Sequence, residues 1–173
     1  MGWVRVYDLR DETARIRQVQ EASLNKPGFG LDTDPALFGS HEWWSAVRDG
    51  QIPNRVIEGT VVDVQWGSMG DWPIWKFGAS DGTVTEWTRE GEHTRYVTGL
   101  AAQVHLVTVR WKTDAVLAPG AQREHEMLVS VDLEDSDERS ARVGPGPFPG
   151  AYDLPTKRSW WMASIRHLLQ RRT

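Results

Sequence analysis

A group of tryptophans with one nearby arginine is the first set of residues in this sequence whose types suit ligand binding. Its members come from consecutive predicted strands and the loop between them: Trp66, Trp72, Trp75, Trp87 and Arg89. Indole rings stack on bases, sugars and peptide groups, and a guanidinium adds a cation above a ring. The same rings also fill cores, because one Trp can bury on the order of 200 Å². The sequence therefore predicts a ligand-binding face if these rings point outward, and a core if they point inward.

Two pairs of adjacent tryptophans lie on predicted helices and form a second candidate site. The pairs are Trp43 with Trp44, and Trp160 with Trp161. Neighbours on a helix differ by about 100° in direction, so one ring of each pair can be buried while the other stays partly exposed. Exposed Trp is enriched at the energetic centres of protein interfaces. We expect these pairs to contact a protein partner or a second copy of the chain.

Carboxylates close to the aromatic group suggest a third kind of chemistry. Asp63, Asp71 and Glu86 lie near it in the sequence, and a glycosidase uses two carboxyl groups about 5–10 Å apart. Spacing along the chain does not give that separation. No Gly-x-Ser-x-Gly nucleophile motif accompanies them. We assign no catalytic residue and expect a protein that is not an enzyme, with a carbohydrate-active enzyme as the third alternative.

Metal and cofactor chemistry lacks suitable ligands. The sequence has no cysteine, which removes disulfides, thiolate zinc sites and cysteine nucleophiles. The five histidines are scattered and form neither a His-x-His nor a His-x-x-x-His pair. We therefore predict no metal site and no cofactor. With no long apolar run and no signal-like start, the chain is expected to be soluble and cytoplasmic.

The charge is mildly acidic and unevenly distributed. The formal net charge is −4, but the last 23 residues carry Lys157, Arg158, Arg166, Arg171 and Arg172 against Asp153 alone. Duplex nucleic acid selects a basic face, so the acidic body disfavours that partner. We interpret the basic tail as the last turns of a helix whose cations offset its own dipole.

Hydrophobic periodicity predicts helices at both ends of the chain and strands between them. Helices are expected before residue 25 and over 40–49, where Ser40 suits the N-cap and Gly50 the C-terminal stop. Period-two patterns predict strands over 3–7, 56–66, 73–79, 83–89, 94–98, 102–112 and 124–133. In the second of these, Val62, Val64 and Trp66 are expected to share one face. A last amphipathic helix is expected over 156–173.

These elements predict a single domain over residues 1–173 of the α+β class. Residues 1–54 supply a strand and helices, and residues 55–133 form an antiparallel barrel-like sheet of five or six strands. An acidic and Pro/Gly-rich connector over 134–155 leads to the C-terminal helix of 156–173. Long strands with interior glycines suit a partly closed barrel, and their spacing is that of an OB-like barrel.

The preferred interpretation of function is non-catalytic binding by a protein-interaction module, either an inhibitor or an accessory subunit. The acidic surface and exposed tryptophans would supply its specificity. The alternative is an OB-like binder of single-stranded nucleic acid or oligosaccharide that uses Trp72, Trp75 and Trp87. Partners are thus expected to be a protein or a second copy of the chain first, and single-stranded nucleic acid or sugar second, with no membrane.

Overall fold

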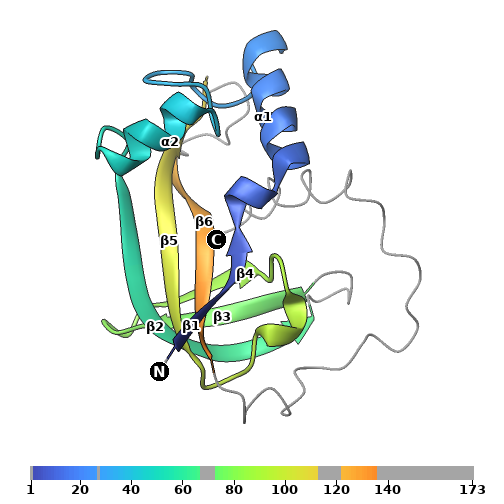
Figure 1. Ribbon diagram of the computed structural model, residues 1–173, viewed down its shortest axis with the longest axis vertical. Coiled ribbons are helices and arrows are strands. Elements are labelled where there is room, and N and C mark those ends of the chain that lie inside the picture. The colour runs from blue at the N-terminus through green and yellow to red at the C-terminus, as the bar shows by residue number, and fades with distance from the viewer. Residues whose placement is uncertain (1, 27, 67–72, 113–121, 136–173) are drawn as a thin grey trace, which may run out of the picture. The chain divides into compact units, whose positions relative to one another are not determined.

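The computed structural model describes residues 2–26, 28–66, 73–112 and 122–135 (Figure 1). The predicted helix over 156–173, the connector before it from residue 136, and Trp72, Trp160 and Trp161 lie outside these residues. The described elements are, in chain order, β1 (Gly2–Asp8), a 3-10 turn (Leu9–Asp11), α1 (Thr13–Asn25), α2 (His41–Arg48), β2 (Asn54–Trp66), β3 (Pro73–Ala79), β4 (Val84–Thr88), a 3-10 turn (His93–Arg95), β5 (Ala101–Arg110) and β6 (Glu124–Asp135).

The strands form one six-stranded antiparallel sheet in the order β1-β6-β5-β2-β3-β4. β2 runs against β3 and β3 against β4. Hydrogen bonds also fix the direction of β5 against β2, because Val61 N–H donates to Leu100 O at 2.9 Å and Thr108 N–H donates to Pro53 O at 2.8 Å. The predicted α+β class with an antiparallel, curled sheet is confirmed.

The order of the strands departs from a simple meander. β5 pairs with β2 rather than with β4 (Figure 1), so β2 is hydrogen-bonded on both of its edges. The strand expected over 94–98 is wrong: His93–Arg95 is a 3-10 turn and the residues after it form a loop. Tyr96 and Val97 are buried in that loop, which explains their apolar character without a strand.

A bulge in β2 changes which side chains face the core. The register with β3 shifts between Val61 and Asp63, and an extra residue at such a point reverses the alternation beyond it. Val61 and Val64 are therefore both buried, while Val62 is 44% exposed. The expected shared face of Val62, Val64 and Trp66 is corrected by this shift.

The chain divides into two compact units, and β2, β5 and β6 contribute residues to both. The first contains β1, β3, β4 and most of β2, and its buried side chains include Val61, Trp75, Tyr96 and Leu133.

The second contains α1 and α2, with Leu9, Phe38, Trp43 and Val107 among its buried side chains. In the second unit, Ser40 caps α2 as predicted, since its hydroxyl accepts the Trp43 N–H at 3.1 Å. None of the described helices is long and apolar enough to cross a membrane.

Candidate functional site

The register between β3 and β4 brings two members of the predicted aromatic group together. Trp75 lies directly opposite Trp87, with ring centroids 5.6 Å apart, and Tyr96 approaches Trp75 at 5.0 Å. Trp75 is 0% exposed, and Trp87 is half-buried. Of the two alternatives for this face, Trp75 therefore fits the core and has no surface for stacking a ligand.

Trp66 and Arg89 form a separate part of this group. The Arg89 guanidinium carbon lies 5.4 Å from the Trp66 ring centroid, and Nη1 donates to His93 O at 3.2 Å. Arg89 is only 3% exposed, and within the described residues its Nε and Nη2 have no hydrogen-bond partner. Burial lowers the pKa of Arg89, and burial together with the Arg89 charge lowers the pKa of His93. A cation held in this way is a costly feature that a core does not require.

Two of the three carboxylates considered for acid–base chemistry, Asp63 and Glu86, lie on neighbouring strands, each beside Lys76 of β3. Asp63 pairs with Lys76 at 3.3 Å, and Glu86 is opposite Lys76 in the register of β3 with β4. Asp71 lies outside the described residues. In the part of the chain that the structure describes, no group of three His, Asp or Glu side chains is placed to hold a metal ion.

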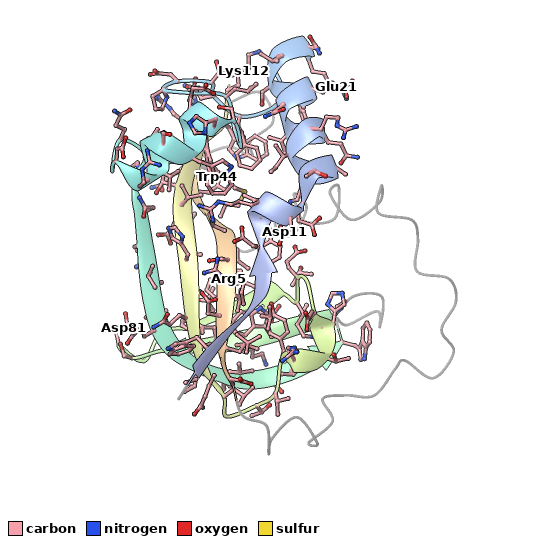
Figure 2. The ribbon with its side chains drawn as sticks, viewed as in Figure 1. Arg5, Asp11, Glu21, Trp44, Asp81 and Lys112 are labelled. Carbon is pink, nitrogen blue, oxygen red and sulfur yellow. The ribbon has the colours of Figure 1, made fainter. Side chains whose placement is uncertain are left out.

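The tryptophans of α2 divide as neighbours on a helix should. Trp43 is buried against Phe38, with ring centroids 5.0 Å apart. Trp44 is half-buried, and the Arg10 guanidinium lies 4.3 Å above its ring. Figure 2 shows Trp44 on α2. Part of the Trp44 ring is thus open to a partner, and the rest is covered by contacts within the chain.

A groove that sequence patterns did not single out opens in the first unit. It has a volume of about 460 Å³ and is lined by the ends of β1 and β6 and by the loop before β5. Apolar side chains form one part of its lining: Val4, Val6, Val97, Leu100 and Leu133. Polar side chains form the rest: Glu92, Thr94, Arg95, Glu134 and Asp135. Its volume is within the range of about 300–1,000 Å³ typical of binding pockets.

Trp3 is not part of the groove's lining, but it is the most exposed tryptophan of the described residues, at 47%. In the register of β1 with β6 it is opposite Glu134, and its neighbour Val4 is opposite Leu133. The alternation of Trp3 and Arg5 with Val4 and Val6 was the available signal in the sequence, because it places Trp3 on the polar face of its strand. An exposed tryptophan ring and a groove with both apolar and charged side chains are each features suited to binding a protein.

The family of the chain is shown by comparison with known proteins. A search of curated proteins gave no match. The family model described as immunity protein RhsI2 matches residues 4–132 of the 173. The match runs from β1 into β6 and so includes every described helix and strand in whole or in part. The chain belongs to the immunity protein RhsI2 family.

Proposed function

We propose that this chain is an immunity protein that binds a protein toxin and blocks its action. The observation that carries this proposal is the family match over residues 4–132. An immunity protein is an inhibitor that acts by forming a complex, which is the first of the functions that the sequence favoured. A protein toxin is a more specific partner than the protein partner that the sequence indicated.

Features of the described surface support a protein partner over the alternatives. The ring of Trp3 is exposed and that of Trp44 is half-buried. In the sequence, Trp3 precedes the 3-10 turn at Leu9–Asp11 and Trp44 follows it. Stacking of single-stranded nucleic acid or sugar was expected to use Trp72, Trp75 and Trp87, and of the two that are described Trp75 is fully buried and Trp87 is half-buried. Large exposed aromatic side chains are typical anchors of protein interfaces.

The proposal is tested by protection of bacterial cells. The partner toxin domain is produced in the cytoplasm, the compartment predicted from the sequence, with and without the chain. The chain should restore colony formation against that toxin and leave killing by an unrelated toxin unchanged. An inactivated form of the toxin should co-elute with the chain in gel filtration, with a Kd of about 10 nM or tighter, as in other inhibitory complexes. Loss of viability at the same rate in both cultures would reject the proposal.

A further inference from the structure

The groove combines an apolar lining with an excess of negative charge. Glu92 is compensated, because its carboxylate pairs with Arg95 Nε at 2.5 Å. Glu134 meets only the Ala101 N–H, at 3.5 Å. Within the described residues Asp135 has neither an ion pair nor a side-chain hydrogen bond. Among the described residues, two carboxylates at one end of the groove are therefore left without a cation.

Asp132 lies on the same strand, three residues before Asp135, and is a carboxylate with a structural arginine partner. Arg5 Nε and Nη2 donate to its two oxygens at 2.7 and 3.0 Å, and this contact raises the pKa of Arg5. Figure 2 shows Arg5 on β1. In the part of the chain that the structure describes, neither Glu134 nor Asp135 pairs with an arginine. A partner that covered them without supplying positive charge would bury uncompensated carboxylates, which is strongly unfavourable.

Trp3 adds a third element of recognition next to these carboxylates. It is opposite Glu134 in the register of the two strands and 47% exposed. A lysine or arginine can place its cation near a carboxylate while its methylene groups or guanidinium pack on an indole ring. The groove thus offers apolar contact and negative charge, and Trp3 lies next to Glu134 on the face of β1 opposite to Val4 and Val6.

We propose that this groove is the docking site for a basic segment of the protein toxin, in which lysine or arginine side chains alternate with apolar ones. The apolar side chains enter the part lined by Val6, Val97 and Leu100, and the cations reach Glu134 and Asp135. This inference rests on the proposed function for the identity of the partner. At about 460 Å³ the groove holds a short segment, so it forms one part of an interface that buries about 800 Å² on each protein.

A peptide pair tests the groove without the toxin. The probes are a fluorescein-labelled peptide that alternates leucine or valine with lysine or arginine, and a counterpart with glutamate at each basic position. Fluorescence anisotropy with the full chain should give the basic peptide an affinity at least about tenfold higher, and this advantage should shrink at 0.5 M salt. Equal affinities, or no binding of either peptide, would overturn the proposal.

Charge-reversal variants locate the binding. The double variant Glu134→Lys with Asp135→Lys should lose the preference for the basic peptide. Glu21→Lys on α1 reverses an equally acidic, exposed side chain outside the groove (Figure 2) and should keep it. Glu134→Gln with Asp135→Asn removes the charge with little change of shape, and should lose most of the preference even if the lysine variant folds poorly. Undiminished binding in the amide variant would refute the assignment.

The basic residues of the chain itself are the competing occupant. Replacing Lys157, Arg158, Arg166, Arg171 and Arg172 by glutamine in the full chain should leave peptide affinity unchanged. A large rise in affinity would show that the chain's own tail occupies the groove, and would overturn the proposal.

The toxin assay separates failure of the groove from failure of the function. If the chain protects cells and the amide variant weakens toxin binding about 100-fold, both proposals stand. If the amide variant binds toxin as tightly as the parent chain, the groove is wrong and the function stands. If the parent chain fails to protect cells although the basic peptide binds, the toxin assignment is wrong.

Discussion

Arg89 is a buried cation that uses only some of its hydrogen-bond donors. Its Nη1 reaches His93 O and its guanidinium lies over Trp66, while Nε and Nη2 remain without partners among the described residues. Leaving donors of a charged group unpaired in an interior costs free energy that apolar side chains would not cost. Arg89 is therefore expected to lower the stability of the fold relative to a side chain of similar length without charge.

Arg89→Met tests this expectation. Met retains the length and much of the packing of the arginine stem but has no charge to desolvate, so the free energy of unfolding should stay the same or rise by about 1 kcal/mol. Arg89→Ala is the matched control and should lose about 2–4 kcal/mol, because it leaves a cavity. Urea denaturation at pH 7.5 measures both. A loss above about 2 kcal/mol in the Met variant would mean that the charge itself stabilises the fold.

His125 gives the second unit a dependence on pH. Its ring stacks on Trp111 with centroids 5.3 Å apart, and burial lowers its pKa below the usual value of 6.5. The unfolded chain then binds a proton more readily than the folded chain. Stability is complete above pH 6.5 and declines as pH falls through 6.5 toward the lower folded pKa. Burial acts on the pKa of His93 in the same direction.

His125→Phe should reduce this dependence. Phenylalanine can stack on Trp111 but cannot take up a proton. The variant should therefore lose less stability between pH 7.5 and 5.5 than the parent chain does. Part of the loss should remain because His93 still titrates. Urea midpoints at the two pH values measure the difference. Equal losses in the two proteins would show that His125 does not contribute.

At the scale of elements, the close approach of β2 and β3 depends on a glycine. A Cβ at Gly59 would lie 2.1 Å from Gly78 O and 2.7 Å from the Phe77 ring. Neither a backbone carbonyl nor a ring in the core can move aside without shifting the strand pair. The interior glycine that the sequence marked as a bend thus marks a close contact between strands, and the bulge lies two to four residues later.

Gly59→Ala should therefore destabilise the protein by more than about 2 kcal/mol. Gly50→Ala is the control: it places a side chain at a positive φ of 75°, but nothing lies within 4 Å of the new Cβ. Its cost should be only about 1 kcal/mol. Thermal melts resolve the two, since about 1 kcal/mol shifts the midpoint of a chain of this size by roughly 2–4 °C. A Gly59 variant as stable as the Gly50 variant would show that the strands can separate without penalty.

The sequence predicts individual elements better than it predicts how they pair. The alternation of β3 and the capping signals Ser40 and Gly50 act over a few residues, and both predictions are confirmed. The bulge between Val61 and Asp63 and the pairing of β5 with β2 depend on contacts distant in the sequence. A local pattern contains no information about those contacts. It therefore could not predict the strand order or which side chains of β2 face the core.

At the scale of the whole molecule, the same limit applies to the candidate site. The groove is lined by residues from three separate parts of the sequence: 4–6, 92–100 and 133–135. None of these has an unusual composition, whereas the tryptophans that attract attention include Trp43 and Trp75, which serve the core. Among the described tryptophans, Trp43, Trp75 and Trp111 are buried and Trp3 is exposed, so the residue type alone does not separate the core from a binding surface. The proposed protein partner rests on the family match, and the basic segment proposed for the groove rests on carboxylates that have no ion pair among the described residues.

The turn at Gly91 has a consequence for how the protein behaves at high concentration. β1 is the last strand at one end of the sheet, and terminal strands can template the addition of strands from other molecules. Here the Glu92 N–H donates to the Val6 carbonyl at 3.0 Å, and the register of β1 breaks between Arg5 and Tyr7. A Cβ at Gly91 would lie 2.0 Å from that carbonyl. A side chain there would open the edge of β1 and favour growth of the sheet into intermolecular assemblies.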